Sequence, residues 1–228
     1  MKKILITLSF LLTLGFATSG VAAQTDGVEA PDLEGMEAAY DVEGLQSVYD
    51  RTFSADIEAL MSSPDADLES LDMSAMMSSI SIQGMTFDSE DNAKAYLEQM
   101  KAEMNKAIEE DDAGTLEDME ISDLEGFDVE GIRVDMDMPD LEIGVSMIIF
   151  TDGNHVFQVM VMNGDMATAQ STADEVAQFA IDAEIENEEI TFSEDGTSTG
   201  GVFDRMPASG DDAVGGLEIV EDYDVLAE

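Results

Sequence analysis

The stretch Met147–Met162, MIIFTDGNHVFQVMVM, decides the fold, because it holds two apolar runs separated by Asp152-Gly153. An Asp-Gly pair between apolar runs is the strongest short-range signal of a β-hairpin, since both central residues of a type I′ turn need positive φ. With these two residues in the turn, Phe150 stands opposite His155, the only histidine of the chain. We therefore predict an antiparallel hairpin whose register follows from this turn.

The strand before this hairpin indicates which face is the core. Its apolar residues alternate strictly with charged ones: Ile132, Val134, Met136 and Met138 with Arg133, Asp135 and Asp137. A tight turn at Pro139-Asp140 pairs Met136 with Ile143, which places the apolar set on the hairpin face that carries Val156. Both turns thus predict the same core face, and the methionines on it are expected to fill gaps between side chains rather than to bind copper.

The opposite face of the sheet is predicted to be graded, from apolar near Phe157, Val159 and Val161 to polar toward Asp135 and Asp137. We expect it to be covered in part by a helix, the C-terminal tail, a partner or a ligand. The predicted ligand or partner face consists of Phe150, His155, Phe157 and Asp135. We expect His155 to be a rim residue packed on Phe150 rather than a catalytic base, because a lone histidine lacks the usual partners of a catalytic or zinc site.

Apolar spacing along the rest of the chain predicts helices and further strands. Helices are expected over about 45–61, 68–80, 88–111 and 168–183, with the first two forming an N-terminal helical hairpin, and strands over 80–87 and 188–192. The fold class is therefore α+β, an antiparallel sheet of about four to five strands packed with helices. Residues 45–192 are expected to form a single domain, and residues 193–228 an acidic, Gly-containing flexible tail.

The N-terminus has the pattern of a cleavable secretory signal. Lys2 and Lys3 precede an apolar run, and Val21-Ala22-Ala23 is a small-residue cleavage pattern, so residues 1–23 are predicted to be removed on export to the periplasm or the extracellular space. The apolar run is short for a membrane span, so we expect no membrane attachment after cleavage. Residues 24–44 are expected to be an acidic linker.

Charge is the strongest compositional signal of the chain. It has 53 Asp and Glu against 8 Lys and Arg, a formal net charge of −45, with 44% hydrophobic residues. Such repulsion destabilises a compact state in dilute buffer, but at about 1 M salt the Debye length falls to about 3 Å and the repulsion is screened. The composition resembles that of exported proteins from extreme halophiles. It excludes nucleic acid as a partner, because few cations are present to meet phosphates.

Catalytic and metal-binding motifs are missing from the sequence. It has no cysteine and no P-loop, GxGxxG, GxSxG or HExxH pattern. The acids between Asp135 and Glu142 lack the glycine and the terminal glutamate of an EF-hand, so we predict no metal site and no cofactor, and leave weak cation binding there as an alternative.

Four segments together resemble the PsbP-like α/β/α domains of exported bacterial proteins: DSEDNAKAYLEQMKAEM, GFDVEGIRVDM, IIFTDGNHVFQVMV and TADEVAQFAIDA, within about residues 80–183. The resemblance rests on element order and the hairpin pattern, and it covers less than half of the chain. It implies a sheet between helices and a non-enzymatic extrinsic or binding module. The lack of a lipid-attachment cysteine and of tryptophan departs from many members of that family.

Three functions agree with these observations. The preferred one is an exported, salt-adapted, non-catalytic domain of the cell envelope that binds an unknown protein or small molecule. The alternatives are a divalent-cation-binding envelope protein and a hydrolase that uses two carboxylates. The oligomeric state, the ligand and the physiological process do not follow from the sequence.

Salt adaptation predicts that folding depends on ionic strength. Circular dichroism should show loss of structure as salt is lowered from molar to millimolar concentrations, because the carboxylates then repel one another over a longer distance. A chain that is fully folded at low ionic strength and gains no stability up to molar salt would contradict the prediction.

Overall fold

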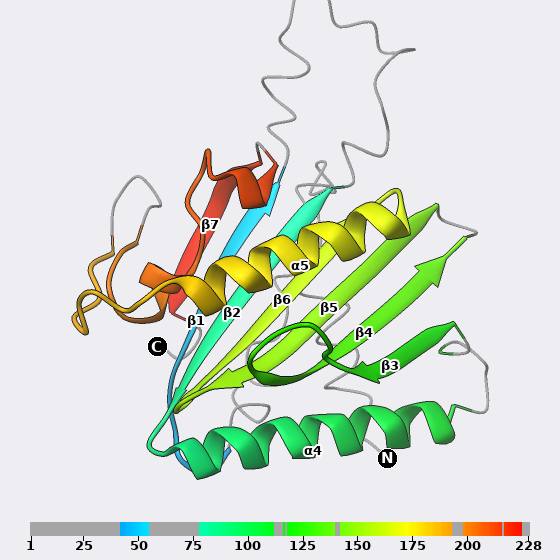
Figure 1. Cartoon of the computed structure of the whole chain (residues 1–228), viewed down its shortest axis with the longest axis horizontal. Helices are drawn as coiled ribbons and strands as arrows, with labels where there is room; N and C mark the ends of the chain where they lie inside the picture. Colours follow the sequence, from blue (N-terminus) through cyan, green and yellow to red (C-terminus); the bar gives the residue numbers. More distant parts are fainter. Residues whose placement is uncertain are drawn as a thin grey trace, which may run out of the picture.

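The fold is a seven-stranded antiparallel sheet with one long helix on each face (Figure 1). The structure is a computed structural model that describes residues 42–54, 78–111, 116, 118–139, 142–192, 198–215 and 217–224. The strands are β1 (Leu45–Ser54), β2 (Ser79–Phe87), β3 (Met119–Asp123), β4 (Glu130–Met138), β5 (Ile143–Asp152), β6 (His155–Asn163) and β7 (Glu218–Asp224). Their order across the sheet is β3-β4-β5-β6-β2-β1-β7, and every neighbouring pair is antiparallel.

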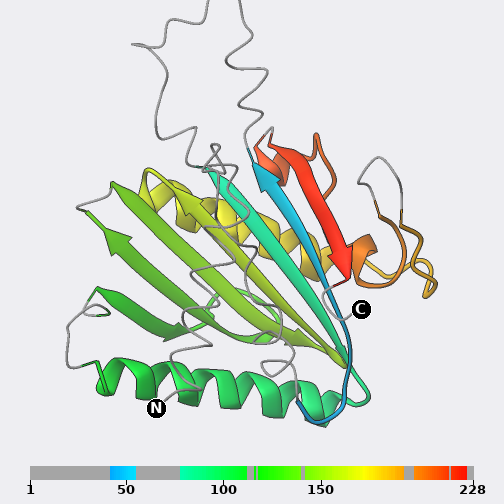
Figure 2. The same ribbon diagram turned by 180° about the vertical axis from the view of Figure 1, so that it is seen from behind.

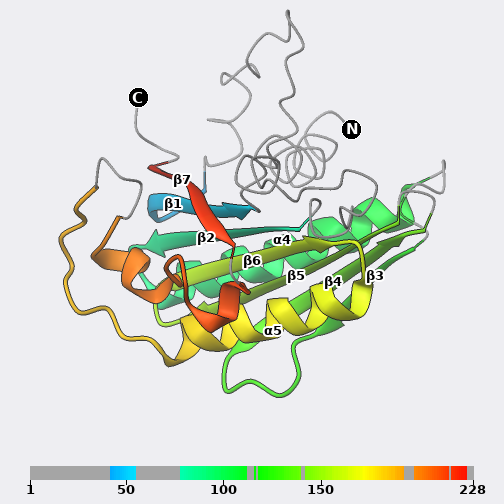
Figure 3. The same cartoon turned by 90° about the horizontal axis from the view of Figure 1, so that it is seen from above.

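The two helices, α4 (Glu90–Glu109) and α5 (Met166–Asp182), lie on opposite sides of the sheet, as the view from above shows (Figure 3). α4 begins within the predicted range, α5 begins two residues before the predicted 168, and each starts with a capping side chain. The backbone N–H of Asn92 donates to Ser89 Oγ at 3.3 Å, and that of Thr168 donates to Asp165 Oδ2 at 2.8 Å. Such caps satisfy donors that the first turn of a helix leaves unpaired.

Each face of the sheet has its own apolar core. The α4 side is packed by Val48, Met85, Phe87, Ala93, Leu97, Met100, Met104, Ile132, Val134, Met147, Ile149 and Val156. This is the core face that the two turns predicted. The α5 side holds Phe53, Ile80, Ile82, Ile148, Phe150, Phe157, Val159 and Val161 beneath Ala169, Ala173, Val176, Ala177 and Ala180. The alanines allow α5 to lie close to the strands, and the graded face is therefore covered by a helix of the chain itself.

The central hairpin forms one residue later than predicted. Asp152 pairs with His155, so the turn consists of Gly153 and Asn154, and Phe150 stands opposite Phe157 rather than His155. Of these two turn residues, Gly153 alone has positive φ, at 59°, which fits a turn with glycine at its first central position. When the turn moves by one residue along the chain, each residue faces a partner two positions away from the predicted one. A shift by two leaves every side chain on its predicted face.

The β4–β5 register is likewise displaced by two residues. Met136 pairs with Val145, and Ile143 pairs with Met138, so the connection is longer than the predicted turn at Pro139-Asp140. The displacement is again even, and the apolar side chains of β4 remain on the α4 side of the sheet.

The first helix of the predicted N-terminal helical hairpin, expected over about 45–61, is wrong. Its described residues, Leu45–Ser54, form the strand β1. Val48 packs toward α4, whereas Phe53 packs toward α5. A strand that is buried on both faces loses the alternation of a half-exposed strand, and its apolar residues then imitate helical spacing. The second predicted helix, residues 68–80, lies outside the described residues except at its end, which belongs to β2. The predicted signal peptide and most of the linker also lie outside them.

The sheet is larger than the four to five strands that we expected, because both β1 and residues after Ser193 take part in it. We expected a flexible tail there, but residues 198–215 and 217–224 form two 3₁₀ helices, η3 (Gly201–Arg205) and η4 (Asp212–Val214), and the edge strand β7, visible from behind in Figure 2. Val202 and Met206 pack so close to β2 that a side chain at Gly84 would lie 2.9 Å from both. The expected strand at 188–192 is only an isolated bridge between Thr191 and Thr199.

Phe203 provides a test of how this C-terminal segment is held. It is 2% exposed, whereas the neighbouring Phe192 is 50% exposed. Phe203→Ala should lower the free energy of unfolding in molar KCl by about 3–5 kcal/mol, because it leaves a cavity in the core. Phe192→Ala is the matched control and should lower it by about 1 kcal/mol or less. Equal urea midpoints for the two variants would contradict the packing described above.

Candidate functional site

The aromatic residues of the predicted ligand face lie inside the protein. Phe150 and Phe157 are fully buried on the α5 side, with their rings stacked at a centroid distance of 5.4 Å and an interplanar angle of 19°. The guanidinium of Arg205, from η3, lies 4.5 Å from the centroid of the Phe157 ring. Side chains of the chain itself therefore occupy the space over both rings, and a ligand would reach them only after the α5 side had opened.

Arg205 connects this aromatic pair to two other elements. Its Nε donates to the carbonyl of Ala180 at 2.7 Å, and its Nη2 lies 2.8 Å from Asp152 Oδ2 at the tip of the hairpin. Burial lowers the pKa of this guanidinium, and Asp152 acts in the opposite direction. The arrangement fixes the C-terminal segment to α5 and to the β5–β6 turn.

His155 lies at the start of β6, half-buried, beside this ion pair. Its Nδ1 is 3.2 Å from the hydroxyl of Thr86 on β2. Burial lowers the pKa of His155 below its ordinary value, the charge of Arg205 lowers it further, and Asp152 partly opposes both. The imidazole is therefore neutral at neutral pH, and its role here is to fill the rim of the sheet beside Phe157.

Asp135 is separated from the other three predicted residues. Phe150 pairs with Gly131, so Asp135 lies four residues further along β4, roughly 13 Å away at the rise of a strand. Gln170 of α5 donates to Asp135 Oδ2 at 2.6 Å. The four residues share one face, as predicted, but they do not line a common opening.

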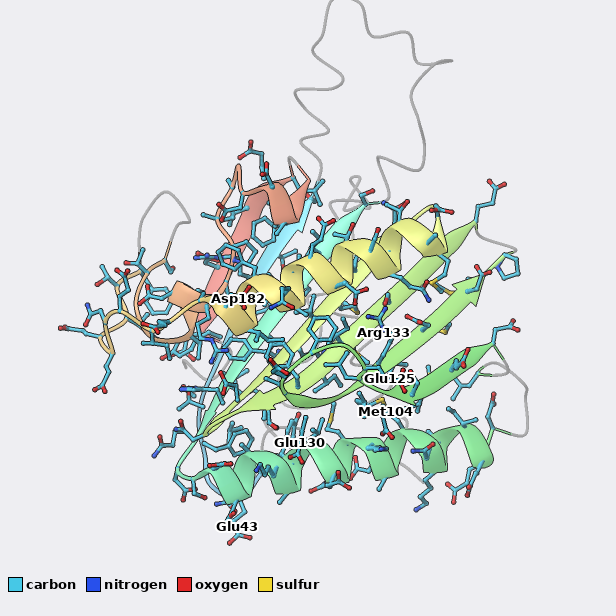
Figure 4. All side chains as sticks on the ribbon, viewed as in Figure 1. Glu43, Met104, Glu125, Glu130, Arg133 and Asp182 are labelled. Atoms are coloured by element: carbon cyan, nitrogen blue, oxygen red, sulfur yellow. The ribbon has the colours of Figure 1, made fainter. Side chains whose placement is uncertain are left out.

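An open groove lies instead between α4 and the connection from β3 to β4. Its volume is about 490 Å³, within the range of small-molecule sites. The apolar lining residues are Leu97, Leu124, Val129 and Ile132, and the charged ones are Lys94, Glu98, Lys101, Asp123 and Glu130. In Figure 4, Glu130 lies between the sheet and α4.

Both lysines of the groove are held by carboxylates at its rim. Lys94 Nζ is 2.8 Å from Glu90 and 3.8 Å from Glu130, and Lys101 pairs with Asp123. The hydrogen bond to Glu90 raises the pKa of Lys94, and the one to Asp123 raises the pKa of Lys101, so both carry full charge. Exposed pairs of this kind contribute about 0–1 kcal/mol, and the lysines can exchange them for a ligand.

Sequence reasoning missed this groove, although one signal was present. Lys94 and Lys101 are seven residues apart, which places them on one side of the predicted helix. The other wall depends on how residues 124–131 return from β3 to β4, and no local pattern indicated that path. The groove therefore becomes apparent only in the tertiary structure.

The described residues contain no group of three or more His, Cys, Asp or Glu side chains that could hold a metal ion. No helix in the described part of the chain is long and apolar enough to cross a membrane.

The lowered pKa of His155 predicts a pH dependence of stability. The unfolded chain, with the ordinary pKa of 6.5, binds the proton more readily than the folded chain does. The free energy of unfolding should therefore fall as the pH drops below 6.5, and the contribution of His155 should level off below the pKa of the folded state. His155→Gln should remove this contribution from urea unfolding curves recorded at molar KCl from about pH 8 to about pH 5. Parallel pH profiles for the two proteins would contradict it.

Comparison with known proteins gives little beyond the structure. No family model matches the chain, and no curated protein matches it. The solved extracellular domain of PknH from Mycobacterium tuberculosis matches with a TM-score of 0.27 and 10% sequence identity, over 44% of this chain and 57% of that chain. The chain thus spans little more than half of the structure that it matches, and a likeness at this level carries no argument. The resemblance to PsbP-like domains stays a prediction.

Proposed function

We propose that the protein is an exported, salt-adapted, non-catalytic binding domain that holds a small organic anion with an apolar body in the groove beside α4. One observation carries the proposal: two of the three lysines in the described chain, Lys94 and Lys101, stand over a groove with an apolar floor. Export rests on residues 1–23, and salt adaptation on the formal net charge of −45.

The chemistry of the groove favours an anion with an apolar part. Leu124 and Val129, in the connection from β3 to β4, are partly exposed apolar side chains of the groove, and covering such surface contributes about 25 cal/mol per Å². Lysine ammonium groups at the rim can donate charge-assisted hydrogen bonds to a carboxylate or a sulfonate. Long-range repulsion between the acidic protein and an anion is screened at molar salt, so the local lysines decide binding there.

The proposed ligand site is separate from the face that the sequence predicted, which consists of Phe150, His155, Phe157 and Asp135. In the folded chain these residues face α5 and the C-terminal segment. Binding at that face would require the chain to give up the core contacts on its α5 side. The groove requires no such change, because it is already open to solvent.

Fluorescence titration with anilinonaphthalene sulfonate at molar KCl tests the proposal. The wild-type chain should bind the dye with saturation, and Lys101→Gln should weaken binding about tenfold, equivalent to about 1.4 kcal/mol. The double variant with Lys94→Gln should weaken it further. Lys106→Gln is the matched control, because Lys106 is an exposed lysine of α4 that pairs with Glu110 outside the groove lining.

Two results would overturn this assignment. Equal affinities for the Lys101 and Lys106 variants would place the dye elsewhere, and wild-type protein that binds no dye would remove the support for an anion site. Circular dichroism of each variant at the same salt concentration shows that the fold is intact, since the dye also binds partly unfolded chains.

A further inference from the structure

The two lysines of the groove beside α4 are spaced along its length. The groove follows α4 from Lys94 to Lys101, and these seven residues correspond to about 10.5 Å along the axis of a helix. Residues three, four and seven apart share one side of a helix, so both ammonium groups face the same opening. A ligand that lies along the groove therefore meets two positive charges, one toward each of its ends.

Each lysine already holds a carboxylate of the opposite wall. Lys101 pairs with Asp123 at the end of β3. Lys94 Nζ lies 2.8 Å from Glu90 of its own helix and 3.8 Å from Glu130 at the start of β4, which is labelled in Figure 4. Both lysine positions thus accommodate a carboxylate that comes from across the groove, and this contact indicates which chemistry fits them.

The two carboxylates of the opposite wall are separated by nearly the same distance as the lysines. Asp123 pairs with Ile132, and Glu130 precedes Ile132 by two residues on the neighbouring strand. The rise and spacing of antiparallel strands place the Cα atoms of the two acids roughly 8 Å apart. One molecule with carboxylates about 8–10 Å apart therefore matches both lysine positions.

Both acids of the opposite wall are easily displaced. The side chain of Asp123 is 78% exposed and that of Glu130 is 74% exposed. Exposed ion pairs contribute little to stability, so their exchange for the carboxylate of a ligand costs little. The displaced carboxylates stay in water, where molar salt screens their repulsion from the ligand.

Glu98 disfavours negative charge at the middle of the ligand. It lines the groove on α4, four residues after Lys94 and three before Lys101. The opposite wall contributes the partly exposed apolar side chains of Leu124 and Val129. An uncharged, apolar chain between two charged ends avoids the repulsion from Glu98 and covers this apolar surface.

We propose that the ligand is an elongated dicarboxylate with an apolar chain, whose ends replace Asp123 on Lys101 and Glu130 on Lys94; this inference rests on the function proposed above. In the free protein the two acids occupy the anion positions as built-in competitors, and they leave when the ligand binds. Extended suberate spans the required distance, whereas succinate is too short to reach both lysines.

Isothermal titration calorimetry in molar KCl at neutral pH tests the proposal with suberate, octanoate and succinate. Octanoate has the chain length of suberate but one carboxylate, and succinate has two carboxylates on a short chain. The wild type should bind suberate about tenfold more tightly than octanoate, and succinate more weakly than suberate. Lys94→Gln should remove most of the preference for suberate over octanoate, whereas Lys106→Gln, outside the groove lining, should keep it.

Asp123→Asn tests whether this acid competes with the ligand. It should strengthen suberate binding about threefold, because an exposed ion pair no longer occupies Lys101. Asp128→Asn is the matched control, since it makes the same charge change at an exposed residue of the connection from β3 to β4, outside the groove lining, and should change binding little. Circular dichroism at the same salt concentration shows that each variant is folded.

The outcomes separate this inference from the proposed function. Wild-type protein that binds the dye but not suberate, or that binds suberate and octanoate equally, would keep the anion groove and overturn the two-ended ligand. Equal gains in the Asp123 and Asp128 variants would overturn the displacement of Asp123. Dye and dicarboxylate affinities that Lys101→Gln leaves unchanged would overturn both the inference and the anion site.

Discussion

The scarcity of positive charge constrains the rest of this structure. The chain has 53 acids and, after residue 3, six lysines and arginines. All three arginines lie on the α5 side of the sheet, where each joins elements that are far apart in the sequence. Arg51 of β1 pairs with Asp222 of β7, and both side chains are at most 2% exposed. The same guanidinium donates to the carbonyls of Ser198, Met206 and Pro207, so one side chain holds most of the C-terminal segment.

Arginine and lysine are divided between two environments in a way that fits their chemistry. Guanidinium groups are planar, weakly hydrated and able to donate several hydrogen bonds, so they suit buried pairs. Breaking such a pair by removing one partner typically costs about 3–5 kcal/mol. The three lysines all lie on α4, in exposed pairs that contribute little to stability. The arginines that stabilise the fold are thus distinct from the two lysines for which we propose ligand binding, Lys94 and Lys101.

The sequence predicted those parts of the fold whose signals are local. The periodicity of the apolar residues indicated both helices, although α5 begins two residues before the predicted 168, and the alternation in β4 identified the face that packs on α4. The exact hairpin register was missed, because Asp152 belongs to the strand and Gly153 alone supplies the positive φ. The error did not exchange the faces, since side chains alternate with a period of two and the displacement was even.

The parts that failed depend on contacts between distant segments. β1 resembles a helix in sequence because both of its faces are buried, and the C-terminal segment resembles a flexible tail because its apolar residues are few. Those few residues, Val202, Phe203 and Met206, lie over β1 and β2, where α5 does not complete the cover of the sheet. The sequence did indicate that something must cover Phe150 and Phe157, but a helix, a tail and a ligand satisfy that requirement equally well. Only the tertiary structure shows that α5 and the C-terminal segment together fill this face, which is why the proposed ligand site lies instead in the lysine-lined groove beside α4.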